Sequence, residues 1–155
     1  MNTNPASTTQ EARAAARRGR AEAIARAGGI EGALAAGLPP YVDTTLSEAI
    51  VLGLYRQGVR TFFCVLGHGS TEIGEVLRIY QEAGLVRACG VRSEIEASHA
   101  ATALRWVTGQ KAAVVTSIGP GALHALAASI APASDGTGVW YLCGDETTED
   151  EGPNM

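Results

Sequence analysis

The stretch from Gly90 to Leu123 constrains the fold of this chain more than any other. It reads GVRSEIEASHAATALRWVTGQKAAVVTSIGPGAL. The end of one strand, a helix starting at Ser93, a turn at Gly109 and a second apolar strand follow one another, which predicts a strand-helix-strand unit. Because ligands bind at the carboxyl ends of parallel strands, Glu94 and the loop Ser117–Gly121 are expected to share one crevice.

Along the chain, further apolar runs are separated by segments with a helical pattern. Few of these runs alternate apolar and polar residues, as a half-exposed strand would. The predicted strands are Thr61–Leu66, Val86–Val91, Ala112–Thr116 and Thr137–Cys143. Strands that alternate with helices in this way are typical of an α/β fold. The sequence therefore predicts a parallel sheet flanked by helices on both faces.

The N-terminal part differs in composition from the rest of the chain. An Ala-, Arg- and Glu-rich helix is predicted from Thr8 to about Ala27, and its apolar side is almost entirely alanine. A short helical stretch and a Pro-containing linker follow. We interpret residues 1–40 as a helical extension and residues 41–155 as the α/β domain. The basic cluster Arg13–Arg20 is interpreted as a solvated helix face.

Charge and composition exclude several classes of function. A formal net charge of -4 argues against a nucleic-acid surface. The three cysteines and three histidines show no metal-ligand spacing, so no metal site is expected. No apolar stretch has membrane-spanning length, and no signal-peptide pattern is present. We expect a cytoplasmic protein that binds neither nucleic acid nor membranes.

The two acidic residues at the start of the central helix have different expected roles. Ser93 and Glu96 have the spacing of a helix cap and its reciprocal partner, so Glu96 has a structural role. Glu94 is left free to meet a ligand, or it complements the helix dipole, an effect of roughly 0.3–1 kcal/mol. The loops Gly67–Gly69 and Gly119–Gly121 are likewise consistent with ligand loops or with plain tight turns. The residues alone leave these alternatives open.

Several of these motifs together resemble a known family. Arg92-Ser93-Glu94 with its alanine-rich helix, Thr108-Gly109-Gln110, and the run Thr116–Ala122 resemble the pyrimidine-binding domain of thiamine-diphosphate enzymes. The acetolactate synthase and decarboxylase group is nearest. Gly67-His68-Gly69 and Leu142–Asp145 are most similar to the trihydroxycyclohexanedione hydrolases. The resemblance covers about residues 44–149.

The resemblance implies a role for each matching residue. In this family a carboxylate bonded to N1′ of the aminopyrimidine stabilises the imino tautomer, which removes the thiazolium C2 proton. By resemblance, Glu94 is that catalytic acid. The residues expected close to the cofactor are Gly67, His68, Gly119, Pro120 and Gly121, together with Glu94. His68 and His124 are expected to contact the substrate. His124 stands where many relatives have Asn, so a helix-packing role for it is left equally open.

The family also holds magnesium and the cofactor's diphosphate on a second domain with a Gly-Asp-Gly motif. Here Gly144-Asp145-Glu146 stands instead. The resemblance thus implies either a fragment of a longer chain or a split subunit. For the split subunit we expect a separate pyrophosphate-binding chain that holds the magnesium, in a heterotetramer or larger assembly. The expected chemistry makes or breaks C–C bonds next to the carbonyl of a 2-keto acid or diketone. The alternative is a non-catalytic α/β module that binds a small anion, a nucleotide or a protein partner.

Overall fold

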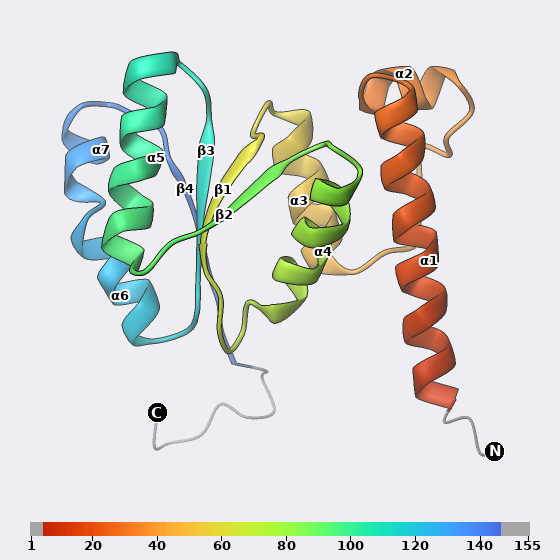
Figure 1. Ribbon diagram of the computed structural model, residues 1–155, viewed down its shortest axis with the longest axis horizontal. Coiled ribbons are helices and arrows are strands. Elements are labelled where there is room, and N and C mark those ends of the chain that lie inside the picture. Colours follow the sequence, from red (N-terminus) through yellow and green to blue (C-terminus); the bar gives the residue numbers. More distant parts are fainter. Residues whose placement is uncertain (1–4, 147–155) are drawn as a thin grey trace.

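A four-stranded parallel sheet forms the centre of the domain (Figure 1). The computed structural model describes residues 5–146 of the chain. The strands are β1 (Thr61–Val65), β2 (Arg87–Gly90), β3 (Ala112–Thr116) and β4 (Trp140–Cys143). They lie in the order β2-β1-β3-β4, and each neighbouring pair is parallel. The predicted parallel sheet is confirmed.

The strand boundaries follow the prediction most closely at the centre of the sheet. β3 has the predicted bounds, whereas the other three strands are shorter than predicted. β4 differs most, since it begins at Trp140 and not at Thr137. The Thr137 N–H donates instead to the carbonyl of Pro132 at 2.8 Å, so this part of the chain belongs to the preceding turn.

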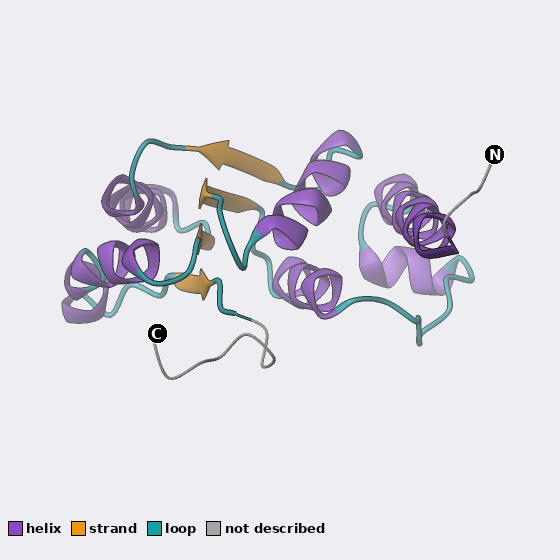
Figure 2. Ribbon diagram, turned by 90° about the horizontal axis from the view of Figure 1, so that it is seen from below, coloured by secondary structure: helices purple, strands orange, loops and turns teal. Residues whose placement is uncertain are grey.

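Helices cover both faces of the sheet (Figure 2). The helices α3 (Leu46–Arg56) and α4 (Thr71–Glu82) lie on one face, and α5 (Glu94–Thr108), α6 (Pro120–Ala127) and α7 (Ile130–Ser134) lie on the other. Ala113 and Val115 pack into the core on the α3–α4 side, whereas Ala112 and Val114 pack against α5 and α6. Burial on both faces explains why β3 is a continuous apolar run.

The segment between β3 and β4 forms two short helices. α6 ends at Ala127, and α7 begins at Ile130 and contains Pro132. Proline is accepted in the first turn of α7 because the N–H groups there have no partner within the helix.

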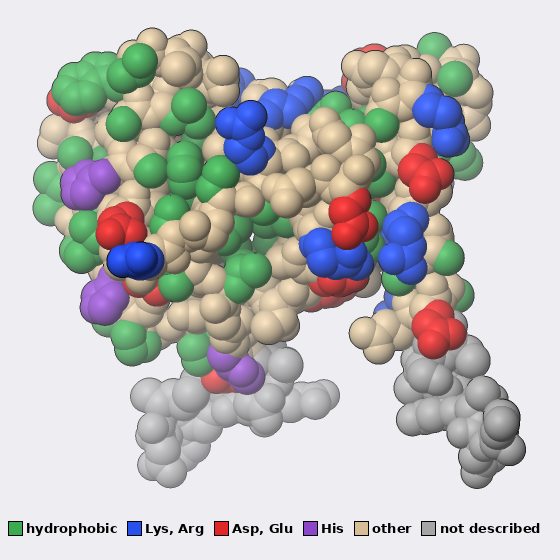
Figure 3. Space-filling model, viewed as in Figure 1, with side chains coloured by type: hydrophobic (Ala, Val, Ile, Leu, Met, Phe, Trp, Pro, Cys, Tyr) green, Lys and Arg blue, Asp and Glu red, His purple; other side chains and the backbone are tan. Residues whose placement is uncertain are grey.

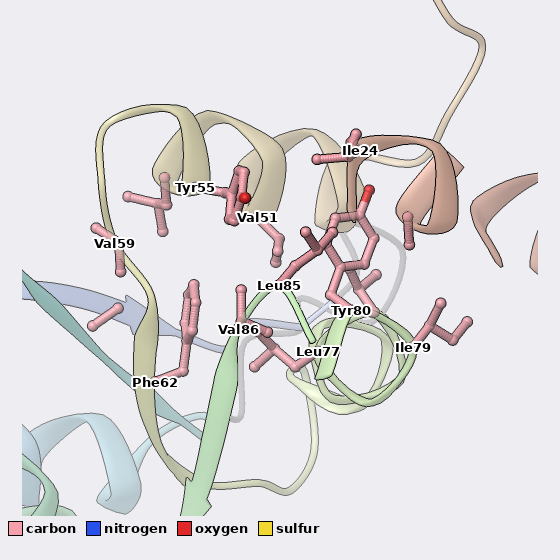
Figure 4. Packing of buried hydrophobic residues seen from close by; sticks show 14 of the residues in the cluster. Ile24, Val51, Tyr55, Val59, Phe62, Leu77, Ile79, Tyr80, Leu85 and Val86 are labelled. Atoms are coloured by element: carbon pink, nitrogen blue, oxygen red, sulfur yellow. The ribbon is translucent and has the colours of Figure 1, made fainter. Parts of the chain in front are cut away.

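The N-terminal segment forms α1 (Pro5–Arg26) and α2 (Ile30–Ala35). α1 begins at Pro5 and not at Thr8, in keeping with the preference for proline at the first helical position. Its C-terminal half is packed, because Ala21 and Ile24 are buried in the core on the α3–α4 side. Figure 4 shows Ile24 of α1 in this core near Tyr80 of α4.

The interpretation of Arg13–Arg20 as a solvated face is wrong for two of its members. Arg17 is only 5% exposed, and its Nε lies 3.2 Å from Glu48 Oε2. Arg20 Nη2 lies 2.8 Å from the same oxygen. Glu48 itself is 1% exposed, so α1 is attached to α3 through a buried ionic cluster. Figure 3 shows basic and acidic side chains interspersed on the outer surface of α1 and α4.

Within residues 5–146, no helix combines the length and the apolar character that crossing a bilayer requires. The acidic segment Gly144–Met155 is described only as far as Glu146, and its remainder lies outside the described residues.

Candidate functional site

The carboxyl ends of β1, β3 and β4 and the start of α5 meet at one end of the sheet (Figure 1). Ser93 adopts extended backbone dihedrals before α5, and its Oγ accepts the N–H of Glu96 at 3.2 Å. The Glu96 carboxylate accepts the N–H of Arg92 at 3.1 Å. This confirms the structural role of Glu96, with the return bond one residue earlier than in a standard capping box. The side chain of Glu94 is not needed for the cap.

Glu94 lies under α6 with little exposure. The residue is 8% exposed. A Cβ atom placed on Gly121 would lie 2.9 Å from Glu94 Oε1 and 2.4 Å from Ser117 Oγ. No side chain larger than hydrogen fits at Gly121 without displacing the carboxylate or Ser117. The loop and the acid are thus brought together at the carboxyl ends of β3 and β2, the two parallel strands on either side of β1.

His124 provides a polar contact to this acid. Its Nδ1 lies 3.4 Å from Glu94 Oε2, and among residues 5–146 it makes the one side-chain contact to the carboxylate that lies within hydrogen-bond distance. The imidazole is 61% exposed, so the contact lies at the edge of the site. The contact is long for a hydrogen bond, and it leaves acceptor capacity on both carboxylate oxygens.

The two glycine loops have different physical requirements. Gly119 has φ 54° and ψ -114°, and Pro120 begins α6. The backbone conformation therefore requires glycine at position 119, whereas limited space requires it at position 121. In the loop after β1, a Cβ atom on Gly67 would lie 2.8 Å from Ser117 Cβ, and the His68 carbonyl accepts the Ile118 N–H at 3.2 Å. The two loops lie directly against each other.

Ser117 was predicted only as the first residue of the loop Ser117–Gly121, and Glu146 was not predicted to belong to the site. The Ser117 side chain fills the space beside both Gly67 and Gly121, and Glu146 Oε2 lies 2.6 Å from His68 Nε2. Each follows the carboxyl end of a strand, β3 and β4 respectively, and that position was the signal available in the sequence. Among the described residues, no three His, Cys, Asp or Glu side chains are grouped so as to hold a metal ion.

Comparison with known protein families agrees with this geometry. The family model described as "Thiamine pyrophosphate enzyme, N-terminal TPP binding domain" matches residues 44–155. The chain belongs to this family. The matched region contains all four strands and the loops of the site. No curated protein sequence gives a match.

A solved structure shows the same fold. It is reported as the "X-ray structure of a putative thiamin diphosphate-dependent enzyme isolated from Mycobacterium smegmatis", and it superposes with a TM-score of 0.58 at 21% sequence identity. The match covers 70% of the present chain and 20% of that chain. The present chain therefore corresponds to about a fifth of that protein's length. The family of thiamine-diphosphate-binding N-terminal domains and the α/β fold are both established by these matches.

Proposed function

We propose that the chain supplies the pyrimidine-binding part of a thiamine-diphosphate-dependent enzyme, with Glu94 as its essential acid. One observation supports this most strongly. The Glu94 carboxylate is almost fully buried at the carboxyl end of the sheet, yet Ser93 and Glu96 already cap the helix. A shielded carboxylate with acceptor capacity left over fits the ring nitrogen of an aminopyrimidine. The residues present therefore suit this cofactor.

Each residue of the site has a distinct part in the proposed function. When bound, thiamine diphosphate supplies a thiazolium carbon that adds to a carbonyl and stabilises the negative charge that follows. Glu94 shares a proton with N1′ of the pyrimidine, and its shielding from water strengthens that hydrogen bond. Gly121 provides the space that the carboxylate occupies, and Gly67, His68, Gly119 and Pro120 form the loops around the ring.

The proposed reaction makes or breaks a C–C bond next to a carbonyl. Its candidates are decarboxylation of a 2-keto acid, transfer of the acyloin or acetolactate type, and hydrolysis of a cyclic diketone. The side chains of His68 and His124 are 70% and 61% exposed at the edge of the site, so both can contact such a substrate. The family match and the residues quoted for the resemblance support this class of chemistry.

The diphosphate and its magnesium are assigned to a pyrophosphate-binding partner chain. The sequence has Gly144-Asp145-Glu146 after β4 and lacks a Gly-Asp-Gly motif. Magnesium in such sites is held by carboxylates together with the phosphates of the ligand, and no group of such side chains occurs among residues 5–146. We expect a heterotetramer or a larger assembly in which the cofactor lies between the two kinds of chain.

Paired substitutions at the start of α5 test the proposal. With the chain co-purified with the chain that carries the Gly-Asp-Gly motif, Glu94→Gln is expected to lower turnover by at least about a hundredfold. It should also slow hydrogen exchange at C2 of thiamine diphosphate. The matched control Glu96→Gln should keep most activity, because a glutamine can still accept the Arg92 N–H.

Two outcomes contradict the assignment. Full activity and normal C2 exchange in Glu94→Gln would show that Glu94 is not the essential acid. An equal loss in both variants with unchanged unfolding midpoints would show that Glu94 has no special role.

A further inference from the structure

The loops after β1 and β4 contact each other, although β3 lies between these strands in the sheet. A Cβ atom on Gly144 would lie 2.8 Å from the carbonyl oxygen of His68. A Cβ atom on Gly69 would lie 2.6 Å from the backbone N and O of Asp145. The two loops therefore pack backbone against backbone across the end of β3. The Gly144 N–H also donates to the Thr116 carbonyl at 3.1 Å, which fixes the chain leaving β4.

This packing places Glu146 beside His68. Glu146 Oε2 lies 2.6 Å from His68 Nε2, a contact between residues 78 positions apart in the sequence. The two side chains differ in exposure, 13% for Glu146 and 70% for His68. The Glu146 N–H donates to Asp145 Oδ1 at 2.9 Å, so the backbone of Glu146 also has a hydrogen-bond partner. A shielded carboxylate thus orients an exposed imidazole.

We propose that His68 is an acid–base group for the substrate and that Glu146 is the positioning residue that orients it. The proposal rests on the proposed function, because it takes the strand ends as the active site. A carboxylate that holds one ring nitrogen of a histidine fixes its tautomer and stabilises the imidazolium, which is the arrangement of proton-transfer histidines in general. With Nε2–H donating to Glu146, Nδ1 is the ring nitrogen left to accept a proton.

The proton-transfer step is balanced within this pair. Neutral His68 accepts a proton at Nδ1 from a substrate hydroxyl, whose O–H bond breaks as the N–H bond forms. The resulting imidazolium is stabilised by the Glu146 carboxylate. His68 returns the same proton to an oxygen or carbon of the product, so no other reactant is needed. Histidine suits this role because its charge changes between about pH 5 and 8.

The first test measures the tautomer of His68 in the full chain without cofactor. Nitrogen-15 NMR at a pH where the ring is neutral should show His68 as the Nε2–H form. Glu146→Ala should change it to a mixture of tautomers, and Glu146→Gln, whose amide oxygen can still accept, should largely restore it. His99, which is exposed on α5, is the internal reference. A His68 spectrum that Glu146→Ala leaves unchanged would overturn the proposal.

The second test is a double-mutant cycle in the assembled enzyme with a panel of 2-keto acids. His68→Asn and Glu146→Ala should each lower kcat/KM about a hundredfold, and the double variant should be no worse than His68→Asn. C2 hydrogen exchange of the cofactor should stay normal, since Glu94 controls that step. Additive losses, or an equal loss of thiamine diphosphate affinity, would overturn the proposal. If C2 exchange is slow in Glu94→Gln but kcat/KM is unchanged in the His68 and Glu146 variants, the role of His68 is refuted and the proposed function still stands.

Discussion

Replacing Glu48 by alanine should lower the free energy of unfolding more than the removal of a surface charge does. The carboxylate is 1% exposed and accepts hydrogen bonds from Arg17, Arg20, Tyr80 and Thr44. Removing it takes the Glu48 carboxylate away from two largely buried guanidinium groups and leaves Arg17 paired only with the half-exposed Glu72, at 3.3 Å. Breaking a buried pair in this way costs about 3–5 kcal/mol, out of a total stability of roughly 5–15 kcal/mol.

The pKa of Glu48 gives a second measure of the same effect. Burial by itself raises that pKa, but hydrogen bonds from Arg20, Thr44 and Tyr80 and the charge of Arg20 lower it from 4.5 to about 2. A depressed folded-state pKa contributes stability above the unfolded value, which is lost as the pH falls through the folded value. The contribution is about 3 kcal/mol at neutral pH and disappears between about pH 4.5 and 2.

The assay is thermal or urea unfolding followed by circular dichroism. A loss of 3–5 kcal/mol corresponds to a fall in melting temperature of roughly 6–20 °C for a domain of this size. The matched control is Glu31→Ala, which removes the Arg56–Glu31 pair at 2.7 Å between α2 and α3, with side chains 63% and 70% exposed. The control should cost about 0–1 kcal/mol. Equal, small losses in both variants would refute the view that the buried cluster attaches α1.

Three further predictions concern the site and the thiols. Gly121→Ala should lower cofactor affinity and turnover, because the added Cβ displaces Glu94 or Ser117. Gly138→Ala should change neither, because a Cβ there meets nothing within 4 Å. Cofactor titration of both variants in the assembled enzyme tests this. By calorimetry, the isolated chain should bind thiamine diphosphate and magnesium only weakly, and tight, magnesium-dependent binding without a partner would refute the split site. Burial raises the pKa of the Cys64 thiol to about 12, so mass spectrometry after iodoacetamide treatment at pH 8 should find exposed Cys143 modified and Cys64 unmodified. Modification of Cys64 before Cys143 would contradict this.

The sequence by itself determined the strands and helix ends that depend on residues close together in the chain. The run Ala112–Thr116 identifies β3 because an apolar segment of that length is buried on both faces of a parallel sheet. The start of α5 was predictable because Ser93 and Glu96 bond to backbone groups within a few residues. The resemblance to the family rested on residues of the same stretch, and the family match confirms it.

The tertiary structure decided the contacts between residues that are distant in the chain. Arg17 and Glu48 are 31 positions apart, and in the sequence each fits an ordinary charge on a helix surface. Nothing in either pattern shows that the two side chains meet in the core. His68 and Glu146 are brought together because the loops after β1 and β4 cross the end of β3, which depends on the strand order. Side-chain periodicity fixes which elements form, but only their packing brings such side chains together.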